Sequence, residues 1–113
     1  MSGRKSRTKG AAWEREVARR FREAMPGCDA KRGWQQRSGA EMADVELPFF
    51  WPECKVGKKP PIRAAMQQAY SDAEGSGRMP IVIIKEDRKR PFVVVDFDDF
   101  LNLVSQWWPA LDR

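Results

Sequence analysis

Two runs of apolar residues in the second half of the chain constrain its fold most. Residues 80–85 contain the uninterrupted series Ile-Val-Ile-Ile, and residues 92–97 contain three consecutive valines after a charged loop at 86–90. Runs that lack polar alternation are typical of strands buried on both faces of a sheet. Such strands need cover on both sides, so we expect an α/β domain with a small mixed central sheet flanked by helices.

The remaining segments predict the elements around this sheet. In the first predicted helix, Trp13, Val17 and Phe21 share one apolar arc, and Glu14 is the only charged residue inside that arc. Pro52 cannot donate a ladder hydrogen bond, so its strand should lie at an edge or contain a bulge. The periodicities predict helices at 11–25, 62–74 and 98–108, and shorter strands at 30–36, 43–47 and 49–56.

Two of the predicted helices have apolar sides that need partners. We expect the second helix to pack through a stripe of Ile62, Met66, Ala69 and Ala73. The last helix is followed by Pro109, and we expect part of its apolar side to cover the sheet. That side consists of Phe100, Leu101, Leu103, Val104, Trp107 and Trp108.

The chain ends suggest a simple domain organisation. Residues 1–10 contain four Lys/Arg and no apolar periodicity, so we expect a disordered basic arm followed by a single domain at 11–113. No stretch approaches the roughly 20 apolar residues of a membrane span, and the N-terminus lacks an apolar signal-peptide core. We therefore expect a soluble, cytoplasmic protein with no membrane partner.

The absence of histidine narrows the possible chemistry. Among 113 residues there are no histidines and two cysteines, Cys28 and Cys54. This excludes histidine general bases, Ser-His-Asp triads and zinc sites that need His or four thiolates. The cysteines are expected to be reduced thiols without a catalytic role. Any catalysis must use carboxylates, lysine or a metal ion held by oxygen ligands.

The charge is unevenly distributed along the chain. The net charge is +7 in residues 1–38, −3 in 39–57, +4 in 58–90 and −3 in 91–113, which gives +5 overall. Basic segments on either side of an acidic one indicate a polyanionic partner such as nucleic acid. The alternative is a basic tail that only keeps the protein in solution.

Three acidic residues and one lysine are candidates for catalysis. Asp44 lies on one short strand, and Glu53 and Lys55 share a face of the next. Carboxylates from separate elements can hold Mg²⁺ beside a phosphate, and a nearby lysine can orient water and stabilise charge. Each residue also has a structural interpretation: a strand-end Asp44, a solvated Glu53–Lys55 pair, and a half-buried Glu14 paired with an arginine such as Arg37.

Together these residues resemble the motifs of a known nuclease superfamily. The chain resembles the PD-(D/E)XK nucleases, and within them it is most similar to archaeal-type Holliday junction resolvases and their phage-encoded relatives. Ala43 stands where the superfamily usually has proline. The motifs are Lys9-Gly10-x-x-x-Glu14-Arg15-x-Val17, Arg37-Ser38-Gly39, Ala43-Asp44-Val45 and Glu53-Cys54-Lys55.

The resemblance implies a fold, an activity and roles for these residues. It implies a restriction-endonuclease-like αβββαβ core and a homodimeric, Mg²⁺-dependent endonuclease of DNA recombination and repair, in which Mn²⁺ can substitute. Asp44, Glu53, the backbone carbonyl of Cys54 and Glu14 would hold the ion, and Lys55 would act on the attacking water. The products would carry 5′ phosphates. Ser38 and Gln67, preferred to Gln68, would be accessory residues.

The expected partner is DNA, most specifically a branched or four-way junction, and not a small-molecule substrate. Two alternatives remain: a related nuclease that nicks other branched or duplex DNA, and a basic DNA-binding protein without catalysis. The position of Glu14 within an apolar arc argues against the second, because a binding protein gains nothing from that cost. Trp34 can stack on a base or belong to the core. The candidate DNA contacts are Arg4, Lys5, Arg7, Lys9, Arg32, Trp34, Arg37, Lys58, Lys59 and Arg63.

Overall fold

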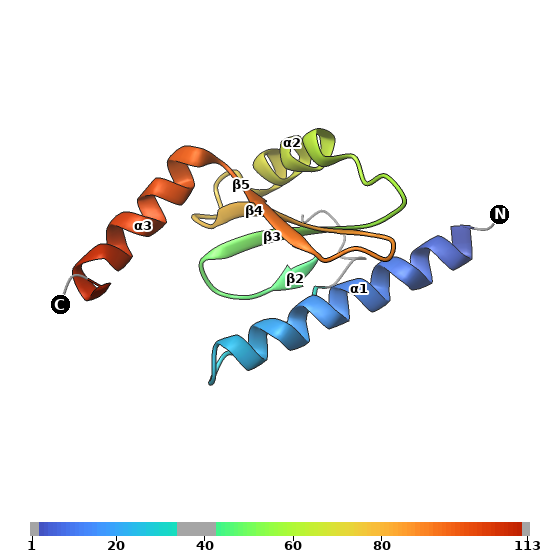
Figure 1. The fold of residues 1–113 in the computed structure, drawn as a ribbon, viewed down its shortest axis with the longest axis horizontal. Helices are drawn as coiled ribbons and strands as arrows, with labels where there is room; N and C mark the ends of the chain where they lie inside the picture. The colour runs from blue at the N-terminus through green and yellow to red at the C-terminus, as the bar shows by residue number, and fades with distance from the viewer. Residues whose placement is uncertain (1–2, 34–42, 112–113) are drawn as a thin grey trace.

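A computed structural model of the chain describes residues 3–33 and 43–111 (Figure 1). Three helices and five strands alternate along these residues, in an order close to the one predicted. The elements are α1 (Gly3–Ala24), β1 (Lys31–Arg32), β2 (Val45–Glu46), β3 (Phe50–Gly57), α2 (Ile62–Ala73), β4 (Met79–Glu86), β5 (Phe92–Val95) and α3 (Phe97–Leu111).

The central sheet is small and mixed, as the sequence predicted. Its strand order is β3-β4-β5, with β3 parallel to β4 and β5 antiparallel to β4. A parallel pair needs a crossover connection, and α2 supplies it between β3 and β4. The short strands β1 and β2 form a separate antiparallel pair in which Arg32 lies opposite Val45.

Helices cover both faces of the sheet, with α1 on one side and α2 on the other (Figure 1). Alternate residues of β4 point to opposite sides, so Ile83 packs with Trp13 and Val17 of α1. Val82 and Ile84 instead pack with α2. The Trp13 indole also donates a hydrogen bond to the carbonyl oxygen of Ile83, at 3.3 Å. The prediction of a strand buried on both faces is therefore confirmed for β4. It is wrong for β5, where Phe92 is 45% and Val93 is 53% exposed, because β5 is an outer strand of the sheet.

The first helix begins earlier than predicted. Residues 1–10 were expected to be a disordered arm, whereas the described part of this segment, from Gly3 on, belongs to α1, which is continuous to Ala24. The physical reason is that extending an existing helix fixes one residue for each hydrogen bond gained, while starting a helix is costly. Lysine and arginine also have good helix propensity. The Lys9 ammonium forms an ion pair with Asp87 at 2.6 Å, which ties this segment to the β4–β5 loop.

The buried face of α2 differs slightly from the predicted stripe. Ala65, Ala69 and Ala73 are buried, whereas Ile62 is 40% exposed and Met66 is partly buried. Small side chains let the helix approach the sheet closely. Ile62 is the first residue of α2, where no preceding helical turn holds it against the sheet.

The last helix does not cover the sheet, contrary to expectation. The structure describes α3 throughout, and none of its side chains is buried. It extends away from the body of the molecule beyond the end of β5 (Figure 1). It also runs past Pro109 to Leu111, because a proline in the last turn removes few helical hydrogen bonds. The amphipathic pattern predicted the helix correctly, but it did not predict that the helix would leave the sheet uncovered.

Pro52 lies on an edge strand, as its chemistry required. β3 is the first strand of the sheet order, and the Pro52 carbonyl oxygen accepts a hydrogen bond from the Asp44 amide outside the three-stranded sheet, at 3.2 Å. In a strand, the backbone nitrogen and carbonyl of one residue point to the same side. The Pro52 nitrogen, which has no hydrogen to donate, therefore faces away from β4, and the sheet loses no hydrogen bond.

Among the helices of the described ranges, none is long and apolar enough to cross a bilayer.

Candidate active site

Asp44 is fixed against the outer edge of β3. Its carboxylate oxygen Oδ2 accepts a hydrogen bond from the Cys54 amide at 2.8 Å. Its backbone carbonyl accepts one from Gly33 at 2.8 Å, and its own amide donates to Pro52. The backbone on both sides of Asp44 is therefore held, and its side chain lies beside the centre of β3.

Glu53 and Lys55 lie on the face of β3 that is turned toward α2, the face on which Trp51 packs with Ala73 of α2. Glu53 is only 9% exposed, and Lys55 Nζ lies 3.7 Å from its Oε2. Burial raises the pKa of Glu53 to about 7, the Asp44 carboxylate adds to that rise, and Lys55 opposes it. The predicted Glu-x-Lys pair thus joins a buried Glu53 to a partly exposed Lys55 on an edge strand, and it is not a fully solvated pair.

Glu14 reaches the same region from α1. It lies between buried Trp13 and Val17, and its Oε1 accepts a hydrogen bond from Arg32 Nε at 2.6 Å. Burial raises the pKa of Glu14, and the Asp44 carboxylate adds to that rise, while Arg32 opposes both. Arg32 was predicted to contact DNA and Arg37 to pair with Glu14. The structure gives the pairing to Arg32, and Arg37 lies outside the described residues.

Cys54, in the middle of β3, lies within electrostatic range of three carboxylates. Burial raises the pKa of the Cys54 thiol, and Asp44, Glu14 and Glu53 each raise it further, so all three act electrostatically on that residue. In the described ranges 3–33 and 43–111, however, no three acidic or cysteine side chains are close enough together to hold one metal ion. Glu14 is instead engaged by Arg32. The thiols of Cys28 and Cys54 are both free.

A fourth acidic residue, Asp72, was missed by sequence reasoning. It lies on α2, and its charge also raises the pKa of Glu53. Its carboxylate accepts a hydrogen bond from Gln68 at 2.8 Å. The preferred Gln67 is exposed and lines a different hollow with Tyr70, so it is Gln68 that is linked to this region. The helical spacing of 68 and 72 was the available signal.

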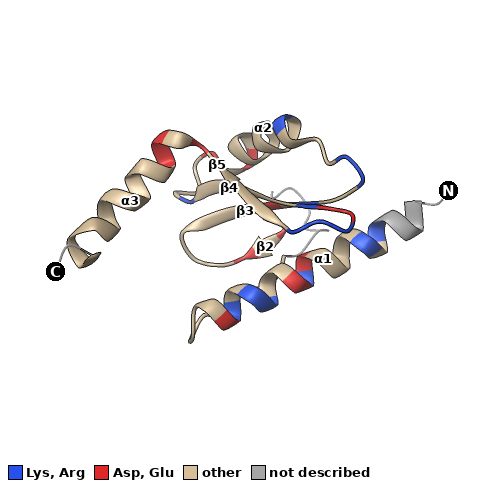
Figure 2. Cartoon of the chain, in the orientation of Figure 1, with Lys and Arg blue, Asp and Glu red and all other residues tan. Residues whose placement is uncertain are grey.

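The basic residues predicted to contact DNA lie mainly on α1 and in loops (Figure 2). Two groups can be placed: exposed Arg7 and Lys9 on α1, and exposed Lys58, Lys59 and Arg63 in the turn after β3 and the first turn of α2. For Arg4 and Lys5 only the helical backbone is described. Ser38 and Trp34, like Arg37, lie outside the described residues.

Comparison with known proteins decides the family. The model of the phage PDDEXK endonuclease family matches residues 5–110. The chain belongs to this family. The PD-(D/E)XK resemblance predicted from the motifs is therefore confirmed, and the chain is a nuclease by family. A search of curated protein sequences gave no match.

The fold of this phage-type PDDEXK chain is also found in a solved structure. It is similar to the 1.6 Å structure of Hjc, a Holliday junction resolvase from the archaeal hyperthermophile Archaeoglobus fulgidus. The TM-score is 0.59 at 21% identity, and the match covers 76% of each chain. The predicted restriction-endonuclease-like α/β fold is confirmed by this likeness.

The pairing of Glu14 with Arg32 leads to a stability prediction for this family member. Arg32→Met should lower the free energy of unfolding by about 1–3 kcal/mol, because it leaves a largely buried Glu14 carboxylate without its partner. Glu14→Gln should be milder, since it removes the charge that burial disfavours. Urea unfolding of both single variants and of the double variant measures the coupling. If the two single effects simply add, the pair is not a coupled unit.

Proposed function

We propose that the chain is a Mg²⁺-dependent, structure-selective DNA endonuclease that cuts branched DNA, in the manner of a Holliday junction resolvase. The observation that supports this most is the arrangement on β3. A largely buried Glu53, its neighbour Lys55 and the edge-bound Asp44 come together on a strand whose outer side is not paired within the three-stranded sheet. That combination supplies acidic oxygen ligands and a cation at one place.

The residues present fit a divalent ion. Burial and Asp44 both disfavour the charged form of Glu53, and a bound cation would offset both effects. Mg²⁺ is commonly held by one or two carboxylates together with water and substrate phosphate, so a cage of three side chains is not needed. Asp44 and Glu53 would hold the ion together with the Cys54 carbonyl oxygen. This carbonyl points to the outer side of β3, as does the Cys54 amide, which donates a hydrogen bond to Asp44. Mn²⁺ would substitute.

With the ion bound, the ion and Lys55 would have separate roles in the hydrolysis. The bound ion would supply positive charge that stabilises the negative charge developing on the phosphate. Lys55 would hold the attacking water and donate to a phosphate oxygen. The water oxygen forms a bond to phosphorus as the bond to the 3′ oxygen breaks, so the ends carry a 5′ phosphate and a 3′ hydroxyl. The 3′ oxygen takes up a proton, and the water loses one.

The substrate we propose is a four-way junction cut by a homodimer. Each chain contains one Asp44, one Glu53 and one Lys55, and therefore one such site. Resolving a junction takes two cuts in opposed strands, which requires two copies. A two-fold dimer matches the near two-fold symmetry of the junction and is the commonest kind of oligomer. The exposed basic residues of α1 and of the turn after β3 would contact the phosphates.

A panel of labelled substrates tests this function. Four-way junction, three-way junction, flap and duplex are incubated with Mg²⁺, Mn²⁺ or EDTA. We expect cleavage with either metal and none in EDTA, with the four-way junction cut fastest. Nicks left by the enzyme should be sealed by DNA ligase, which needs a 5′ phosphate and a 3′ hydroxyl. Equal cutting of all four substrates would favour a general nicking nuclease, and cutting in EDTA would overturn the metal assignment.

A further inference from the structure

The helix α3 carries a large apolar side that nothing within residues 3–33 and 43–111 covers. At 3.6 residues per turn, its large apolar residues fall on one side of the helix. Trp107 is 61% exposed and Trp108 is 59% exposed, in a helix without a single buried residue. The exposed members of this side are Phe97, Phe100, Leu101, Trp107, Trp108 and Leu111. Contiguous apolar surface of this kind marks an interaction site.

The base of α3 is held in its projecting direction. The Asp96 carboxylate accepts a hydrogen bond from the Asp99 amide at 3.1 Å and so caps the first turn of the helix. The same carboxylate accepts a hydrogen bond from the Tyr70 hydroxyl on α2. Only this one residue separates β5 from α3. These contacts fix the direction in which the helix leaves the sheet, and the part of the chain that the structure describes buries none of its side chains.

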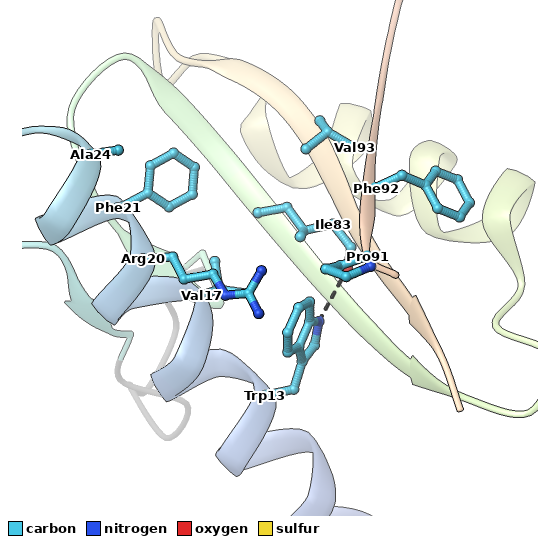
Figure 3. A pocket seen from close by; sticks show the side chains of 9 residues that line it. All are labelled: Trp13, Val17, Arg20, Phe21, Ala24, Ile83, Pro91, Phe92 and Val93. Atoms are coloured by element: carbon cyan, nitrogen blue, oxygen red, sulfur yellow. Dashed lines mark hydrogen bonds between the residues drawn. The ribbon is translucent and has the colours of Figure 1, made fainter. Parts of the chain in front are cut away.

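A complementary apolar groove lies elsewhere on the same molecule, between α1 and β5 (Figure 3). Its volume is about 290 Å³ and its walls are almost entirely apolar. Val93 is 53% exposed there, beside the place where α1 packs on β3 and against Ile83 of β4. The lining residues are Trp13, Val17, Arg20, Phe21, Ala24, Ile83, Pro91, Phe92 and Val93.

The charges of the two surfaces are opposite. The helix α3 contains Asp98 and Asp99 and no Lys or Arg, so a DNA backbone would repel it. The helix α1 contains eight Lys/Arg against three Glu, and the Arg20 side chain points into the groove (Figure 3). Arg20 is the charged residue of the groove lining, and its Nε pairs with Glu16 of the same helix at 3.0 Å. The groove is therefore apolar and lies on a helix of net positive charge, which suits an apolar helix of net negative charge. Both surfaces, the apolar side of α3 and the groove between α1 and β5, belong to this one chain.

We propose that α3 of one copy docks into the α1–β5 groove of a second copy, and that the second copy returns the same contact. The occupant of the groove is therefore another molecule of this chain. The exchange makes a closed two-fold dimer in which each molecule gives one helix and receives one. Trp107 and Trp108 are the anchors, since large aromatic side chains contribute most to such interfaces. This inference rests on the homodimer of the proposed function and adds which surfaces form it.

Two variants test the exchange, each breaking one half of the contact. Trp107→Arg puts a positive charge on the helix, and Val93→Arg puts one in the groove; both positions are exposed in the single chain, so the fold should persist. By light scattering, the unmodified protein should give about twice 13.0 kDa and each variant alone about 13.0 kDa. An equimolar mixture of the two should again contain dimer, because the intact helix of one fits the intact groove of the other.

The control is Ile62→Arg, an exposed apolar residue on α2 outside both surfaces, and it should remain dimeric. Circular dichroism checks each fold. Should Val93→Arg unfold, Ala24→Arg at the exposed α1 wall of the groove replaces it.

The outcomes separate this inference from the proposed function. A monomeric unmodified protein would overturn both the exchange and the proposed homodimer. Dimeric variants would overturn the exchange alone and leave a homodimer formed through another surface. A monomeric helix variant beside a dimeric groove variant would indicate that two α3 helices pair, and the reverse would indicate that two grooves do. A mixture that stays monomeric would also contradict the exchange. The cleavage panel tests the nuclease independently of all these results.

Discussion

Asp44→Asn, Glu53→Gln and Lys55→Ala should each reduce cleavage about a thousandfold or more while DNA binding and folding persist. The first two remove the charge of a proposed metal ligand, and the third removes the cation 3.7 Å from Glu53. Asn at position 44 keeps a side-chain oxygen that can accept the hydrogen bond from the Cys54 amide, so the local backbone should stay in place. Cleavage is measured in single turnover, and binding by gel shift in Ca²⁺ or EDTA.

A carboxylate outside the site provides the matched control. Glu46→Gln on β2 changes the net charge by the same amount and should cut like the unmodified protein. Without metal, Glu53→Gln should melt at the same temperature as the unmodified protein or higher, because burial and Asp44 disfavour the charge it removes. Near-normal cutting by Asp44→Asn would contradict the site assignment, since Asp44 is the carboxylate that accepts a hydrogen bond from the Cys54 amide.

Gly33→Ala should be the most damaging small substitution, lowering the free energy of unfolding by more than about 2 kcal/mol. A Cβ atom at this position would lie 2.0 Å from the carbonyl oxygen of Ala43, which is main chain and cannot turn away. Gly33 also donates its amide to the Asp44 carbonyl. The strain would therefore displace the segment that positions Asp44, and cleavage should fall along with stability.

Gly10→Ala is the matched control for that substitution. Gly10 lies inside α1, where an added Cβ would meet nothing within 4 Å. Alanine in a helix interior is favoured over glycine by about 0.5–1 kcal/mol, so this variant should be slightly more stable. Urea unfolding measures both. If Gly33→Ala unfolds at the same urea concentration as the unmodified protein, the close approach to Ala43 is not a constraint.

The sequence predicted what depends on local pattern. The apolar run in β4 required cover on both faces, and α1 and α2 provide it. Alternation along residues 49–56 predicted that Glu53 and Lys55 share one face, and in β3 their side chains lie 3.7 Å apart on one face. Glu14 stood out because it was the only charge in an apolar arc, and it is half-buried on α1.

What the sequence did not predict depends on how distant elements meet. The partner of Glu14 is Arg32, because β1 passes beside α1. Asp72 could not be linked to Glu53 without knowing which face α2 turns to the sheet. The apolar side of α3 had to be covered, but amphipathicity does not say whether the cover comes from the same molecule.

The outward positions of β3 have a consequence for solubility. An open sheet edge is normally prone to aggregation, because its unpaired amides can form hydrogen bonds with a strand of another molecule. Here Pro52 has no amide to offer, and the next outward amide, that of Cys54, is already taken by the Asp44 side chain. Two successive attachment points are therefore blocked. The strand that carries the candidate chemistry can stay open to a substrate without becoming a template for sheet growth.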